Sequence, residues 1–193
     1  MAKRLKDAFT ETVLAGQSFV DTCAEDVLFL AEKIVYAFKA NNKLLICGNG
    51  GSAADAQHMA GEFVNRFMIE RNPLPAISLA TDTSVITSIA NDYSYDMVFS
   101  KQVHALGTPG DILLVISTSG NSANLLKAVE EAGKRSIYTA ALLGGSGGKL
   151  RSMVELPLVV NSNITPRVQE IHLFIEHMLC QIVDDILSPA FRD

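Results

Sequence analysis

Hydrophobic positions repeat at helical spacing over the first forty residues of the chain. Apolar side chains recur three or four positions apart, which is the period of one face of an α-helix. The pattern predicts a helix from Lys3 to about Ala40, with a break near Cys23 to Asp26. Such a long apolar stretch needs a partner surface. The residues that carry the pattern are Val27, Leu28, Ala31, Ile34, Val35 and Phe38.

Short apolar runs alternate with helical patterns from Lys43 onward. The predicted strands are 43–47, 76–79, 111–116, 137–142 and 156–160; the predicted helices are 52–67, 84–89, a stretch ending near Leu106, 123–132 and 166–187. This alternation predicts a parallel sheet covered on both faces, a three-layer αβα sandwich with long N-terminal and C-terminal helices. Its ligand site is expected at the carboxyl ends of the strands. The last helix is apolar on more than one face, which indicates burial at a subunit contact.

A glycine loop, Cys47-Gly48-Asn49-Gly50-Gly51-Ser52, follows the first predicted strand. Gly50 and Gly51 let the backbone turn sharply and approach a ligand closely. The helix that begins near Ser52 directs free N–H groups and its positive dipole end toward that place, which suits a phosphate. The alternative is a tight strand-to-helix turn without a ligand.

The same loop also fits a dinucleotide-binding pattern, G-x-G-x-x-A, through Gly48, Gly50 and Ala53. That motif is weak alone, and Asp82 comes late for the acidic residue expected after the second strand. A dinucleotide fold also leaves a second hydroxyl-rich loop unexplained. We therefore disfavour it.

The second polar loop is Ser117-Thr118-Ser119-Gly120-Asn121-Ser122, after the clearest predicted strand. Its hydroxyl, amide and backbone N–H groups could surround phosphate oxygens with neutral donors. An ordinary serine-rich turn with a helix N-cap is the alternative. Two such loops at one sheet edge favour the ligand site.

Two groups of polar and ionisable residues lie on predicted helices. His58 and Glu62 are four residues apart and so share one face, beside the glycine loop. A carboxylate there is well placed to move a proton between adjacent sugar carbons. An ordinary surface pair is the alternative. The final helix carries Gln169, Glu170, His172, Glu176 and His177, which could instead mark its solvent face.

Composition restricts the partners. The net charge of −5, from 16 basic and 21 acidic residues, gives no broad basic surface for nucleic acid or anionic lipid. No signal peptide or membrane-spanning apolar run is recognisable, so we expect no membrane partner. Three widely spaced cysteines without a C-x-x-C pair indicate a reducing, cytoplasmic setting.

Taken together, four segments resemble the sugar isomerase (SIS) domain family, and within it the phosphoheptose isomerases. The resemblance spans nearly the whole chain, implies one flavodoxin-like SIS domain over 1–193, and is highly specific as a set. In some members of the family an Asp stands at the position of Pro166. The segments are CGNGGSAADAQHMAGEFVNRF (47–67), IANDY (89–93), STSGNS (117–122) and TPRVQEIHLFIEH (165–177).

The resemblance implies conversion of D-sedoheptulose 7-phosphate to D-glycero-D-manno-heptose 7-phosphate through an enediol, for lipopolysaccharide or another surface glycan. It gives Glu62 as the base and His177 as the acid. It also implies a homotetramer and one Zn²⁺ per subunit, with the ligands His58, Glu62, Gln169 and His177. The implied substrate-binding residues are Asn49, Gly50, Gly51, Ser52, Glu62, Asn91, Asp92, Ser117, Thr118, Ser119, Ser122 and Gln169.

Helix geometry qualifies this ligand set. Gln169 and His177 are eight residues apart, about 12 Å along a continuous helix, whereas metal–nitrogen distances are about 2 Å. Both can reach one ion only through converging side chains, a bent backbone or different subunits. Glu62 also cannot easily be both a tight ligand and a free base.

Two noncatalytic alternatives stay open. A SIS-domain paralogue that binds the bacterial replication initiator resembles this chain, also in Asn65-Arg66-Phe67, but lacks Glu62 at the matching position. A sugar-phosphate sensor would keep the two loops without needing Glu62 and His177. The presence of both residues favours an enzyme.

Overall fold

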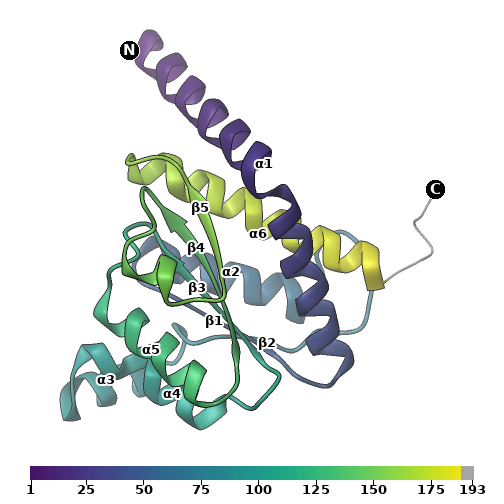
Figure 1. Cartoon of the computed structure of the whole chain (residues 1–193), viewed down its shortest axis with the longest axis vertical. Coiled ribbons are helices and arrows are strands. Elements are labelled where there is room, and N and C mark those ends of the chain that lie inside the picture. The colour runs from purple at the N-terminus through teal and green to yellow at the C-terminus, as the bar shows by residue number, and fades with distance from the viewer. Residues whose placement is uncertain (188–193) are drawn as a thin grey trace.

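A five-stranded parallel sheet forms the centre of the molecule, as the sequence predicts (Figure 1). The structure, a computed structural model, describes residues 1–187. The strands lie in the order β2-β1-β3-β4-β5, and all four neighbouring pairs are parallel. Their bounds are β1 Leu44–Gly48, β2 Ala76–Ser78, β3 Ile112–Ser117, β4 Tyr138–Gly144 and β5 Leu156–Val160.

Helices cover both faces of this sheet. The α-helices are α1 Ala2–Lys39, α2 Gly51–Val64, α3 Thr83–Asp92, α4 Val98–Leu106, α5 Ala123–Lys134 and α6 Thr165–Leu187; two short 3₁₀ helices are η1 Tyr95–Met97 and η2 Lys149–Ser152. Successive strand residues point to opposite faces, so Leu44 and Ile46 pack on one core and Leu45 and Cys47 on the other. The first core joins the sheet to α1, α2 and α6, and the second joins it to α3, α4 and α5. The predicted three-layer sandwich is confirmed.

Three predicted boundaries are wrong. Helix α1 is continuous from Ala2 to Lys39, because the segment 23–26 contains no proline or glycine that would break it. Helix α2 ends at Val64 rather than at residue 67. Asn91 and Asp92 do not begin a loop; they are the last two residues of α3.

The two predicted ligand loops meet at one edge of the sheet. Gly48 at the end of β1 pairs with Ile116 near the end of β3, and Ser117 pairs with Leu143 of β4. The loops after β1, β3 and β4 therefore leave neighbouring strands on the same side, as expected for carboxyl ends of parallel strands.

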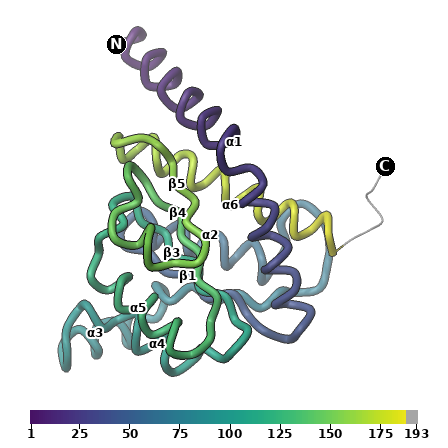
Figure 2. Tube along the Cα trace, in the orientation of Figure 1, coloured from purple at the N-terminus to yellow at the C-terminus, as the bar shows by residue number. Residues whose placement is uncertain are grey.

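The first turns of α1 project beyond the rest of the chain (Figures 1 and 2). This part of the helix carries large apolar side chains that are exposed, among them Leu5, Phe9 and Leu14. The second half of α1 packs against α6 and β5. Across residues 1–187, every helix is too short or too polar to cross a membrane.

Candidate active site

The glycine loop brings β1 directly into α2. Gly50, before the first residue of α2, has a φ of 57°, a conformation that glycine adopts without steric cost. Gly51 is in contact with the Gln169 side chain, so a Cβ at position 51 would collide with that amide. The structure therefore brings Gln169 of α6 to the predicted phosphate loop. Ser52, in the first turn of α2, is buried.

Asn49 is held by two side chains from distant parts of the sequence. Its amide exchanges two hydrogen bonds with Asn124 of α5: Asn49 Nδ2 donates at 3.0 Å and Asn124 Nδ2 donates back at 2.8 Å. The Tyr95 hydroxyl donates to Asn49 Oδ1 at 3.1 Å. Asn124 and Tyr95 are structural parts of the site that no local motif revealed.

Asn91 and Asp92 lie close to this network in sequence but bond to each other. Asn91 Nδ2 donates to Asp92 Oδ1 at 2.9 Å, and both side chains are exposed at the end of α3. Within residues 1–187, the contact from this segment to the glycine loop is made by Tyr95, three positions later. The substrate contacts expected of Asn91 and Asp92 stay predictions.

The serine loop is folded upon itself. Ser117 Oγ accepts from the Gly120 N–H at 3.1 Å, and Ser119 Oγ accepts from the Asn121 N–H at 3.3 Å. Gly120 has a φ of 63° and touches the Gly147 backbone. Ser122 is the N-cap of α5, yet its hydroxyl makes no capping bond. That hydroxyl is free to meet a ligand at the helix N-terminus.

A polar cavity of about 260 Å³ opens beside the serine loop. Thr118 and Ser119 line one side, and the turn after β4 with the start of α6 lines the other. Its Ser146, Ser162 and Asn163 were not predicted, because they come from segments without a motif. The remaining lining residues are Gly144, Gly145, Thr165 and Val168.

Helices α2 and α6 lie side by side and bring the predicted acid–base residues together. His58 Nε2 and His177 Nε2 are 2.9 Å apart, although 119 residues separate them in sequence. His58 Nδ1 is 3.8 Å from Glu62 Oε1. His58 therefore lies between Glu62 and His177. In a hydrogen bond at this distance, one imidazole nitrogen donates and the other accepts.

The predicted zinc ligands fit by type and only partly by position. Two imidazoles bound tetrahedrally to one Zn²⁺ place their nitrogens about 3.3 Å apart, close to the His58–His177 distance of 2.9 Å. Glu62, however, lies against the opposite nitrogen of His58. Gln169 lies at Gly51, seven residues, or about 10 Å, before His58 along α2. Among residues 1–187 no three His, Cys, Asp or Glu side chains are grouped to hold a metal.

Known proteins match this architecture along nearly the whole chain. A family model described as the SIS domain matches residues 8–144. A phosphoheptose isomerase of Shewanella baltica (strain OS155) is 50% identical over 192 residues, covering 98% of each chain. The chain belongs to the SIS domain family, in its phosphoheptose isomerase branch.

Solved structures agree with this SIS-family membership. The phosphoheptose isomerase GmhA of Neisseria gonorrhoeae has a TM-score of 0.90 at 43% identity, with 95% of this chain and 98% of that chain covered. A phosphoheptose isomerase of Francisella tularensis has a TM-score of 0.92 at 40% identity over the same shares. The predicted fold and the prediction of an aldose–ketose isomerase are confirmed at the level of the family.

A more distant structure shares the SIS fold. The Vibrio vulnificus NanR protein, solved in complex with ManNAc-6P, has a TM-score of 0.67 at 17% identity; 98% of this chain and 64% of that chain are covered. At that identity the likeness shows the fold only.

Two polar residues of α6 in this SIS chain are buried rather than on a solvent face. His172 and Glu176 have no exposed surface, which contradicts the alternative given for them above. His172 Nε2 donates to the Leu143 carbonyl at 3.2 Å, and burial lowers the pKa of His172 to about 4. Both carboxylate oxygens of Glu176 lack a hydrogen-bond partner. Burial, and then the charge of Asp55, raises the pKa of Glu176 to about 8.

Proposed function

We propose that the chain interconverts D-sedoheptulose 7-phosphate and D-glycero-D-manno-heptose 7-phosphate through an enediol. The observation that carries this proposal is the convergence of Glu62, His58 and His177 from α2 and α6. Glu62 and His58 lie on the helix that begins at the glycine loop, and His177 lies on α6. The identity to phosphoheptose isomerases over the full length supports this substrate.

The proposed reaction moves two protons. The Glu62 carboxylate takes a proton from C1 of the ketose, while the C2 carbonyl oxygen receives a proton from His177, giving the enediol. At the enediol stage the partly exposed Glu62 carboxyl exchanges this proton with water. Glu62 then protonates C2, and the C1 hydroxyl gives its proton back to His177, leaving the aldehyde at C1. The side chain of Glu62 is 26% exposed, so its carboxylate can reach a ligand.

Neutral donors hold the phosphate in this proposal. Ser117, Thr118, Ser119 and Ser122 surround the N-terminus of α5, and Ser52 lies at the N-terminus of α2. Two helix N-termini and these hydroxyl groups can stabilise a dianion without a lysine or arginine. Asn49, Gly50 and Gly51, with Asn91, Asp92 and Gln169, would contact the sugar. This arrangement assigns phosphate binding to the loops and proton transfer to the helices.

A zinc ion would be held by His58 and His177, the two predicted ligands whose positions fit. When bound, it would orient the substrate oxygens or polarise the carbonyl. Zinc binding at His177 Nε2 and proton transfer by that same nitrogen exclude one another. Glu62 stays free as the base in both cases.

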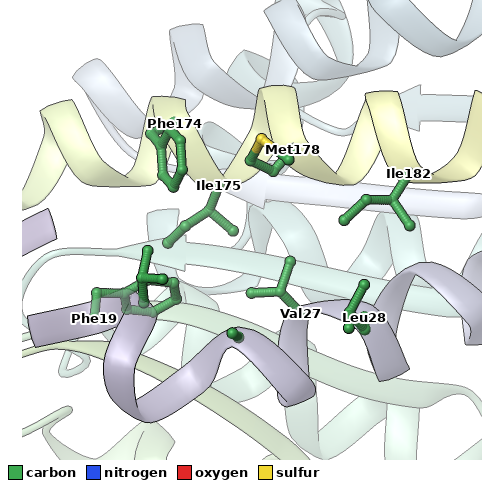
Figure 3. Close-up of a pocket in the computed structure, with 9 residues that line it drawn as sticks. Phe19, Val27, Leu28, Phe174, Ile175, Met178 and Ile182 are labelled. Carbon is green, nitrogen blue, oxygen red and sulfur yellow. The ribbon is translucent and has the colours of Figure 1, made fainter. Parts of the chain in front are cut away.

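We propose that the chain acts as a homotetramer in the cytoplasm, supplying heptose for a surface glycan. An apolar groove of about 220 Å³ lies between α1 and α6 (Figure 3). Val20, Leu28 and Phe174 along it are each more than 40% exposed. A second copy of the chain would bury them.

All three cysteines are free thiols, which suits a reducing compartment. Sedimentation equilibrium tests the tetramer, and a monomeric mass would contradict it.

The test of this function is product formation by the purified protein. Wild type and Glu62→Gln are incubated with sedoheptulose 7-phosphate, with a chelator or with added zinc, and the products are identified by NMR. We expect aldoheptose 7-phosphate from wild type and at least about 10³-fold less from Glu62→Gln. An inactive wild type in every condition would refute the function. Full activity of Glu62→Gln would remove Glu62 as the base.

The chelator decides between the two roles of His177. Loss of activity that zinc restores would support zinc at His58 and His177. Activity that persists after chelation would support His177 Nε2 as the acid.

A further inference from the structure

Arg71 is a buried arginine in the connection between α2 and β2. Its side chain is only 6% exposed, and its Nε donates to Asp184 Oδ1 of α6 at 2.6 Å. Asp184 is equally buried, with 3% of its side chain exposed. A buried charge pair of this kind is costly unless the remaining donors are also used. The Nη1 and Nη2 groups of Arg71 also have hydrogen-bond partners.

The guanidinium of Arg71 binds the carboxyl end of α2. Its Nη2 donates to the Glu62 carbonyl at 2.9 Å, and its Nη1 donates to the Phe63 carbonyl at 2.8 Å. Two longer contacts from Nη1 reach the carbonyls of Asn65 and Asn72, at 3.5 and 3.3 Å. The last carbonyls of a helix have no partner within it, so Arg71 supplies one. One of these carbonyls belongs to Glu62 itself.

Asp184 is seven residues after His177 on α6, which places both on the same side of the helix. Arg71 therefore connects the backbone of Glu62 to the helix that carries His177. A planar fork with five donors can hold these partners at fixed angles, which a lysine cannot do.

We propose that Arg71 is a positioning residue that sets the Glu62 carboxylate relative to the His58–His177 pair. The proposal rests on the proposed isomerisation. Proton transfer requires the carboxylate within hydrogen-bonding reach of the carbon-bound proton. A displacement of about 1 Å can cost about 10²-fold in rate. Loosening Arg71 therefore lowers kcat and leaves phosphate binding by the distant loops intact.

An ion pair between a partly exposed lysine and a buried aspartate provides the control. Lys43 Nζ lies 2.7 Å from Asp111 Oδ2, with Asp111 fully buried. These residues precede β1 and β3, at the amino edge of the sheet, opposite to the candidate site. Removing the charge of Lys43 destabilises the fold without touching α2 or α6. The comparison separates positioning from stability.

The experiment compares Arg71→Lys, Asp184→Asn and Lys43→Met in the full chain. Melting temperature, kcat and KM for sedoheptulose 7-phosphate are measured well below each melting point. We expect kcat to fall about 10-fold to 100-fold in Arg71→Lys and Asp184→Asn, with KM within about 3-fold. Lys43→Met should keep the wild-type kcat despite a lower melting temperature. Wild-type kcat in both site variants would overturn the proposal.

An NMR measurement keeps this test independent of catalysis. The chain has four histidines, so the ¹⁵N-imidazole signals can be assigned by single substitutions. The signals of His58 and His177 should shift in Asp184→Asn and not in Lys43→Met, while His104, which binds Glu131, serves as reference. If wild type is inactive but these shifts occur, the proposed function fails and the positioning role stands. Unchanged signals would refute the positioning role, even if Arg71→Lys does not fold.

Discussion

The two halves of the candidate site differ in their charge and in their hydrogen bonding. The loop half, formed by the turns after β1 and β3, consists of neutral side chains that bond to one another. Asn49, Asn124 and Tyr95 form one network, and the hydroxyls of Ser117 and Ser119 accept bonds from their own loop. These loops are therefore ordered before a ligand arrives.

The helix half, formed by α2 and α6, is ionisable and incompletely bonded. Among residues 1–187, the buried side-chain nitrogen and oxygen atoms without a partner all belong to these two helices. They are on Asp55, Arg167, His172, Glu176 and Asp184. Unpaired polar atoms cost free energy when buried, and such costs are concentrated at functional sites. This difference agrees with the proposed division, in which the loops bind the phosphate and the helices transfer protons.

The largest effect is expected when the proposed acid, His177, is removed. His177→Gln should lower kcat by about 10²-fold to 10³-fold, because general acid–base groups contribute on that scale. KM should stay within about 3-fold, since the loops hold the phosphate. Steady-state kinetics on the purified variant measures both constants, and His104→Gln on the far helix α4 is the control. A rise in KM without a fall in kcat would place His177 in the binding half.

The next effect concerns the pH dependence of stability. Glu176 has a pKa of about 8 when folded and 4.5 as the ordinary value, so the folded state retains a proton that the unfolded state loses. Stability therefore falls as pH rises from 4.5 to 8. Between pH 6 and pH 8 wild type should lose about 2 kcal/mol relative to Glu176→Gln. Urea unfolding at each pH measures this, with exposed Glu25→Gln as control. Parallel curves for wild type and Glu176→Gln would contradict it.

A smaller effect is expected in the loop half. Ser119→Ala should raise KM about 10-fold, the value of one hydrogen bond to a charged group. It should leave kcat within about 2-fold, because the reacting carbons lie near the helices. Ser152→Ala, whose hydroxyl bonds to Lys149 on the surface of η2, should change neither constant. A selective fall in kcat for Ser119→Ala would break the division.

The smallest effect should come from Tyr95. Tyr95→Phe removes one exposed hydrogen bond to Asn49 and should raise KM about 2-fold to 3-fold. Asn124→Ala leaves Asn49 without its two mutual bonds and should raise KM further. Kinetics on both variants ranks the two contacts. Equal KM values for both variants and wild type would show that the network does not order the loop.

Local sequence patterns predicted the elements and the two loops well. Apolar runs such as Leu44 to Cys47 are buried on both faces, which is the pattern of strands in a parallel sheet covered by helices. The glycine and serine loops are likewise local, because their backbone conformations are encoded by Gly50 and Gly120.

Contacts between distant segments could not be predicted. Arg71 and Asp184 are 113 residues apart, and Tyr95 is 46 residues from Asn49. Neither contact has a periodic or motif signal. The sequence left open whether Glu176 lies on the solvent face of the last helix. The packing of α6 against α2 and the sheet shows that it is buried. The same packing places Gln169 at Gly51 and Glu62 beside His58 Nδ1, and the four-ligand zinc set stays a prediction.

Solvent isotope incorporation tests the central claim most directly. Wild type converts sedoheptulose 7-phosphate in D₂O, and ¹H NMR measures the hydrogen remaining at C2 of the aldoheptose phosphate. Proton transfer by Glu62 through an enediol predicts deuterium at C2 in wild type and no incorporation above background in Glu62→Gln. Conversion without any deuterium at C2, or incorporation by Glu62→Gln at the wild-type rate, would contradict the account.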